Sequence, residues 1–121
     1  MKIKTILLAE DETIIAMDIK NILERNGFKD VTMLADGKSL LDKAIIEGGD
    51  LIITDILFKK EIDGIEAVEE IWEEIDIPVI FISGMEINLA KKLTLSNYQF
   101  LKKPFNEKEL LEAVYRSLNN P

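Results

Sequence analysis

Several side chains able to do phosphoryl chemistry follow the short apolar runs of this sequence. In chain order they are the pair Glu10–Asp11, then Asp55, then Ser83–Gly84, and finally Lys102, Lys103 and Pro104. Carboxylates gathered at ~4 Å repel by about 4 kcal/mol per pair at an effective dielectric of ~20, so they raise a pKa or recruit a cation. With oxygen ligands only, Mg²⁺ is the expected occupant. A lysine and a hydroxyl beside it can contact phosphoryl oxygens, which predicts phosphoryl transfer to a carboxylate.

Each of these residues also has an ordinary explanation. Asp11 or Glu12 could cap a helix, Ser83 could be a turn residue, and Lys103 could be a surface lysine. Asp55 is harder to explain in this way, because an aspartate that closes a buried strand is costly unless it is used or paired. The functional reading therefore depends on whether these residues meet in space.

Composition removes several other kinds of chemistry. The 121 residues include no cysteine and no histidine, which excludes disulfides, thiolate catalysis, imidazole metal sites and Ser-His triads. A net charge of −8 argues against direct binding to nucleic acid, which needs a basic surface.

The chain length and the apolar runs indicate one compact domain over 1–121, with no output domain. The apolar stretch near the N-terminus is too short for a signal peptide, and no run approaches the ~20 residues that span a bilayer. We therefore expect a cytoplasmic protein that does not bind membranes.

The apolar runs also predict the elements that position the polar residues. Strands are expected at 6–9, 31–35, 51–53, 79–82 and 98–101, the second and last nearer the sheet edges. Helices are expected at 12–26, 37–47, 64–75, 86–95 and 107–119. Gly27 lies where a helix C-terminal cap belongs, and Asn106 with Glu109 resembles a capping box. The outer face of the 64–75 helix carries a row of glutamates: Glu66, Glu69, Glu70, Glu73 and Glu74.

A strand followed by a helix, five times over, predicts a doubly wound α/β fold with a five-stranded parallel sheet and helices on both faces. Ligands of such sheets bind beyond the carboxyl ends of the strands. Because the polar residues named first all follow predicted strands, we expect them to converge at that edge.

With these residues in place, the sequence resembles the receiver domain of two-component response regulators over essentially its whole length. The resemblance implies the flavodoxin-like strand order 2-1-3-4-5, for which a chemotaxis receiver is a standard example. It makes Asp55 the phosphoacceptor and Ser83 the switch hydroxyl. The metal ligands that it implies are Glu10, Asp11, Asp55 and the backbone carbonyl of Leu57.

The segment from Phe100 to Phe105 matches an aromatic-x-x-Lys-Pro-Phe signature of the same family. By this match Lys103, and not Lys102, contacts the phosphoryl group, and Phe100 is the switch aromatic. Pro104 and Gly84 support the site, and the Lys103–Pro104 peptide bond is expected to be cis.

The implied function is signalling with Mg²⁺ as cofactor. A sensor histidine kinase or a phosphotransfer protein supplies the phosphoryl group, and the face formed by the residues at 86–95, 98–101 and 107–119 changes for a downstream protein acting in trans. Such a domain is not an enzyme, although it assists its own phosphorylation and dephosphorylation.

Two departures from the family pattern stand out. Lys59 occupies a position where many receivers have proline, and nine residues (64 − 55) separate Asp55 from Gly64, one more than expected, so the Phe58–Asp63 loop is expected to be unusual. In addition, Leu57 and Met85 are apolar and cannot orient a hydrolytic water, which predicts slow loss of the phosphoryl group.

Three other functions remain to be weighed. A phosphatase or phosphotransferase of the haloacid-dehalogenase type needs a second aspartate two residues after the nucleophile, where this chain has Leu57. A flavodoxin-like cofactor carrier needs a Gly/Ser/Thr-rich phosphate loop, where this chain has Ala9-Glu10-Asp11-Glu12. A phosphate-independent interaction domain is disfavoured by the intact set of acceptor, carboxylate pair, hydroxyl and lysine.

Overall fold

A computed structural model of the chain describes residues 3–58, 63–84 and 97–119. The elements in chain order are β1 (Thr5–Ala9), α1 (Thr13–Arg25), β2 (Asp30–Leu34), α2 (Gly37–Glu47), β3 (Leu51–Asp55), α3 (Gly64–Trp72), β4 (Val79–Ser83), β5 (Tyr98–Lys102) and α4 (Glu107–Asn119). Within these ranges, no helix is long and apolar enough to cross a bilayer.

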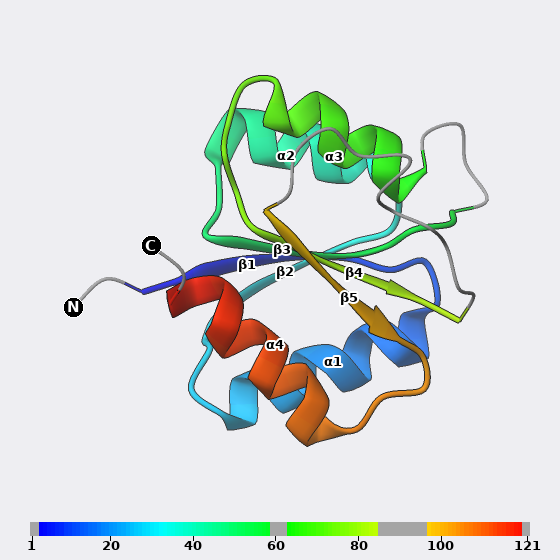
Figure 1. Cartoon of the computed structure of the whole chain (residues 1–121), viewed down its shortest axis with the longest axis vertical. Helices are drawn as coiled ribbons and strands as arrows, with labels where there is room; N and C mark the ends of the chain where they lie inside the picture. Colours follow the sequence, from blue (N-terminus) through cyan, green and yellow to red (C-terminus); the bar gives the residue numbers. More distant parts are fainter. Residues whose placement is uncertain (1–2, 59–62, 85–96, 120–121) are drawn as a thin grey trace.

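The five strands form one sheet in the order β2-β1-β3-β4-β5, and every neighbouring pair is parallel. This is the predicted order, with β2 and β5 at the edges. The carboxyl ends of the strands therefore share one edge of the sheet, which lies on the right in Figure 1.

Helices cover both faces of the sheet, with α2 and α3 on one side and α1 and α4 on the other (Figure 1). Alternate residues of a strand serve opposite faces, so Leu7 and Ile52 pack in the α2/α3 layer while Leu8 and Ile53 pack in the α1/α4 layer. Both layers are apolar, which explains why the central strands show no alternation in the sequence.

The end of α1 is set by a glycine. Gly27 has φ of +95°, its N–H donates to the Glu24 carbonyl, and the Phe28 N–H donates to the Leu23 carbonyl. These two bonds form a Schellman motif, in which glycine adopts the left-handed conformation without a Cβ clash. The predicted cap is confirmed, and the helix runs over 13–25 rather than 12–26.

Two other helix ends differ in how well they were predicted. The capping box of α4 is confirmed, because Glu109 N–H donates to Asn106 Oδ1 at 2.8 Å and Asn106 N–H donates to Glu109 Oε1 at 3.1 Å.

The prediction that α3 extends to residue 75 is wrong, since the helix ends at Trp72. The Trp72 indole N–H donates to the Ile77 carbonyl at 2.8 Å, and this contact turns the chain toward β4.

Parts of two predictions fall outside the described residues. The helix expected at 86–95 lies there, and so does most of the Phe58–Asp63 loop, including Lys59.

Candidate functional site

Three carboxylates meet at the carboxyl edge of the sheet. Asp55 is the last residue of β3 and Glu10 directly follows β1, and the pairing of Ala9 with Thr54 brings the two strand ends side by side. One carboxylate oxygen each from Glu10, Asp11 and Asp55 lies within 4.8 Å of the others. We call these residues the strand-end carboxylates.

The strand-end carboxylates differ in burial. Glu10 is 3% exposed and Asp55 is 8% exposed, whereas Asp11 is the most exposed of the three. Backbone amides stabilise two of the buried oxygens, because Leu57 N–H donates to Asp55 Oδ1 and Glu12 N–H donates to Glu10 Oε2, each at 3.3 Å. Asp11 is therefore placed to meet solvent species, while Asp55 is held in a fixed direction.

Lys103 joins this group from β5. Its Nζ donates to Glu10 Oε1 at 2.6 Å and to Asp55 Oδ2 at 3.0 Å. The Lys103 N–H donates to the Ser83 carbonyl at 2.8 Å, and the Lys103–Pro104 peptide bond is cis, as predicted. Residues separated by 93 positions in the sequence thus share one hydrogen-bonded cluster.

One ammonium among three carboxylates leaves the cluster with excess negative charge. Burial raises the pKa of Glu10 to about 7, helped by the nearby charge of Asp55 and opposed by the hydrogen bond from Lys103. Burial alone would lower the pKa of Lys103, but its hydrogen bonds to Glu10 and Asp55 outweigh this and raise it. The cluster therefore holds protons tightly when no other cation is present.

The donor set suits a hard divalent cation. Carboxylate oxygens are what Mg²⁺ prefers, and it typically binds through one or two of them and keeps several waters. The spacing within 4.8 Å allows one ion to contact all three strand-end carboxylates, and the exposed position of Asp11 gives it access from solvent. These residues therefore fit such an ion.

Other predicted site residues lie on the neighbouring strands β4 and β5 or directly after them. Ser83 is the buried last residue of β4, next to the strand that carries Asp55, and Gly84 follows it. Phe100 lies on β5, paired in register with Phe81 and packed against the core under α2 and α3. Lys102, in contrast to Lys103, is exposed.

Two positions bear on the predicted slow hydrolysis. The Leu57 side chain is 48% exposed beside the site. Met85 lies outside the residues that the structure describes.

Gly64 is a site residue whose role sequence reasoning missed. A Cβ at this position would lie 1.9 Å from the Asp55 carbonyl oxygen, and the Gly64 N–H donates to the Ile56 carbonyl at 2.8 Å. The start of α3 thus presses directly on the backbone of the buried aspartate. The sequence signal for this contact is a glycine at the first position of the predicted 64–75 helix, where other residues are more common.

Comparison with known proteins gives consistent results. The family described as response regulator receiver domain matches residues 6–115. The chemotaxis protein CheY of Bacillus subtilis is 32% identical over 118 residues, which cover 94% of this chain and 97% of CheY. The transcriptional regulatory protein PdtaR of Mycobacterium tuberculosis is 27% identical over 113 residues, covering 92% of this chain and 55% of PdtaR. This chain spans about half the length of that relative.

A solved structure agrees over nearly the full chain. The response regulator receiver protein from Sinorhizobium medicae WSM419 superposes with a TM-score of 0.88 and 29% identity, covering 98% of this chain and 97% of its own. The parallel sheet, the carboxylates at its edge and these similarities lead to one conclusion: the chain belongs to the response regulator receiver family.

Proposed function

We propose that this domain accepts a phosphoryl group on Asp55 from a sensor histidine kinase or a phosphotransfer protein. The observation that carries the proposal is the fixed position of the Asp55 carboxylate, with Lys103 on one oxygen and the Leu57 amide on the other. A structural salt bridge would not need two further carboxylates, from Glu10 and Asp11, facing the same point.

In the transfer step, the phosphorus–nitrogen bond of a phosphohistidine breaks and a bond from phosphorus to an Asp55 carboxylate oxygen forms. The leaving imidazole takes up a proton from solvent. Lys103 stabilises the charge on the transferring oxygens, since its ammonium has three donors and already lies 3.0 Å from Asp55 Oδ2. Leu57 N–H keeps the acceptor oriented.

Mg²⁺ would be held by Glu10, Asp11, Asp55 and the Leu57 carbonyl. When bound, it neutralises negative charge on the phosphoryl oxygens. Glu10 must give up its proton for this role, and its pKa of about 7 makes that release easiest above neutral pH.

The rim of the site supports a protein as phosphodonor. Lys103, Pro104 and Phe105 share a groove of about 530 Å³ with Ile14 and other residues of α1. Ile14 is 84% exposed, a large apolar side chain beside the reactive group. A protein surface docking there would bury it and place a histidine over Asp55.

The acyl phosphate would act as a switch. Ser83 would move toward the phosphoryl group and donate its hydroxyl to a phosphoryl oxygen. Phe100 would then rotate into the space that Ser83 leaves. The phosphate thus favours one of two existing states. Gly84 permits the movement of the chain after Ser83, and Pro104 keeps Lys103 in place.

A direct connection links β5 to α4. Gln99 Nε2 donates to the Ala113 carbonyl at 2.8 Å and to Ser117 Oγ at 2.6 Å, and Arg116 Nε donates to Gln99 Oε1 at 2.9 Å. A shift of Phe100, the next residue on β5, would therefore reach the face formed by β5 and α4. We propose that a downstream protein reads this face.

The test is intact mass after incubation with acetyl phosphate and Mg²⁺. The wild type should gain one phosphoryl group, and Asp55→Asn should gain none while keeping its circular dichroism spectrum. Equal labelling of both proteins would move the acceptor elsewhere, and no labelling of the wild type would favour the phosphate-independent interaction domain.

The lifetime of the phosphoryl label tests the expectation that the phosphoryl group is lost slowly. Because the apolar side chain of Leu57 cannot orient a water molecule, the phosphoryl group should be lost slowly, and Leu57→Asn with Met85→Glu should speed the loss. A half-life of seconds in the wild type, unchanged in this double variant, would contradict the proposal.

A further inference from the structure

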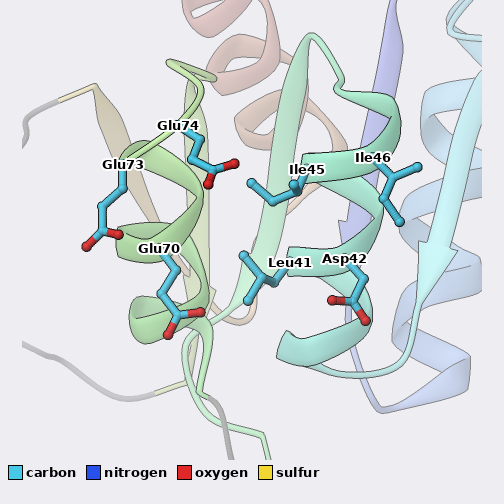
Figure 2. A pocket seen from close by; sticks show the side chains of 7 residues that line it. All are labelled: Leu41, Asp42, Ile45, Ile46, Glu70, Glu73 and Glu74. Carbon is cyan, nitrogen blue, oxygen red and sulfur yellow. The ribbon is translucent and has the colours of Figure 1, made fainter.

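A second groove lies between α2 and α3, away from the strand-end carboxylates. It has a volume of about 440 Å³ and is lined by Leu41, Asp42, Ile45, Ile46, Glu70, Glu73 and Glu74. Figure 2 shows Leu41 and Ile45 reaching from α2 toward α3, with the carboxylates of Glu70 and Glu74 reaching back toward α2. The groove therefore has an apolar side and an acidic side.

The apolar side of the groove leaves large aliphatic side chains exposed to solvent. Ile46 is 79% exposed, and Ile45 is only partly buried. The Leu41 side chain is also partly buried and packs against the hydrophobic core under α2 and α3. Leu41 and Ile45 are four positions apart, so they share one face of α2 and form the kind of apolar stripe that docks another apolar surface, with Ile46 pointing away from α3.

The negative charge on the α3 side of the groove is not balanced by basic side chains among the described residues. Asp42 has Lys38 at 3.5 Å, but among the described residues no lysine or arginine forms an ion pair with Glu70, Glu73 or Glu74. We call these three residues the α3 carboxylate row.

The α3 carboxylate row is also placed where it weakens the helix. Glu70 lies in the last turn of α3, Glu73 caps the helix and Glu74 follows it, and the last turn carries no basic residue to offset the helix dipole. Carboxylates kept at the negative end of a helix, beside an exposed apolar stripe, indicate a surface suited to a cationic ligand.

We propose that the α2–α3 groove binds a cationic amphipathic helix of a partner protein. Apolar side chains spaced along one face of such a helix would pack on Leu41 and Ile45, and lysines or arginines beside them would meet the α3 carboxylate row. This inference does not depend on phosphorylation of Asp55.

Other occupants fit less well. A second copy of this chain, placed symmetrically on the groove, would bring the same glutamates near one another, and each copy carries a net charge of −8. Anionic membranes and nucleic acids are repelled by the same charge.

The probe is a 14-residue peptide of leucine and lysine, capped at both ends, with its leucines on one helical face. Titrated into ¹⁵N-labelled full chain, it should shift the amides of α2 and of the second half of α3. A peptide of the same composition, scrambled so that the leucines line no face, should bind at least about tenfold more weakly, because it cannot present its apolar and basic faces together.

Two matched pairs of charge reversals distinguish peptide binding in the α2–α3 groove from general attraction of a cationic peptide to an acidic protein. Glu70→Lys with Glu74→Lys should weaken peptide binding about tenfold, from the loss of two exposed ion pairs. Glu24→Lys with Glu112→Lys alters the net charge equally on exposed positions of α1 and α4, and should change binding less than twofold. Equal weakening by both pairs would overturn the proposal.

A matched apolar pair locates the hydrophobic contact. Ile45→Ser should weaken binding several-fold, whereas Ile14→Ser, on the other groove, should not. The reverse result would assign the peptide to the α1 groove, and concentration-dependent dimerisation through α2 in sedimentation would replace the peptide by a second copy. Either result would overturn the proposal.

Discussion

The strand-end carboxylates and the α3 carboxylate row are built from the same residue types and behave differently. Glu10 and Asp55 are buried and share the Lys103 ammonium, and burial raises the pKa of Glu10 to about 7 although Lys103 opposes this. Glu70, Glu73 and Glu74 face solvent. Charge that is buried and paired can be used for chemistry, whereas exposed charge serves attraction at longer range.

The largest expected difference comes from adding one methyl group beneath Asp55. Gly64→Ala should lower the free energy of unfolding by about 3 kcal/mol, because the new Cβ would lie 1.9 Å from the Asp55 carbonyl oxygen. Urea titration followed by the fluorescence of Trp72, the single tryptophan, measures this. On the same helix, Glu70→Ala should change stability by less than about 0.5 kcal/mol. A loss for Gly64→Ala no greater than that control would mean that the close contact does not exist.

The next largest effect concerns the shared ammonium. Lys103→Met should slow labelling by acetyl phosphate about 100-fold, equivalent to ~2.7 kcal/mol, because the transferring charge loses its donor. Lys102→Met removes the same charge from the neighbouring, exposed position and should leave the rate within about twofold. Equal rates for the two variants would show that position 103 has no special role.

A smaller effect appears as pH dependence in the absence of divalent cations. The folded-state pKa of Glu10 is raised from 4.5 to about 7, so its contribution to stability is full below pH 4.5 and is lost as pH rises through 7. Glu10→Gln should therefore gain about 2 kcal/mol relative to the wild type between pH 4.5 and 8, less than the ~3.4 kcal/mol of a fully unscreened change from 4.5 to 7, because the cluster is partly open to solvent. Glu74→Gln serves as the exposed control and should keep a constant difference. A constant difference for Glu10→Gln as well would mean that burial does not perturb this carboxyl.

The smallest effect is a stabilisation. Glu73→Lys should raise the free energy of unfolding by about 0.5 kcal/mol, because a cation replaces an anion at the C-terminal end of α3. The same denaturation assay measures it, and 0.5 M salt should reduce the gain. Destabilisation would indicate that Glu73 has a cationic partner in solution.

Much of the fold could be predicted from local signals. The bounds of α2 and α4 match their predicted ranges, because Asp36 caps α2 by accepting from Ser39 N–H and the Asn106–Glu109 box caps α4. The end of α3 could not be predicted, since it depends on a contact of Trp72 with Ile77 that forms only after the chain has turned.

The site was predictable to the level of which residues meet. Strand order alone places Glu10, Asp55 and Lys103 at one edge. A raised pKa among the gathered carboxylates was expected, but its location on Glu10 and the close contact at Gly64 could not be predicted, because both depend on burial and on distances set by the packed structure. The roles assigned to Ser83 and Phe100 stay predictions.

The contact at Gly64 has a mechanical consequence. The Gly64 N–H donates to the Ile56 carbonyl, and the Asp55 carbonyl oxygen occupies the space that a Cβ at position 64 would need, so the end of β3 and the first turn of α3 are closely packed. A displacement of the first turn of α3 is therefore expected to move the backbone at the end of β3 as well. Since α3 also supplies one wall of the groove in Figure 2, this contact joins that wall to the strand end that carries Asp55.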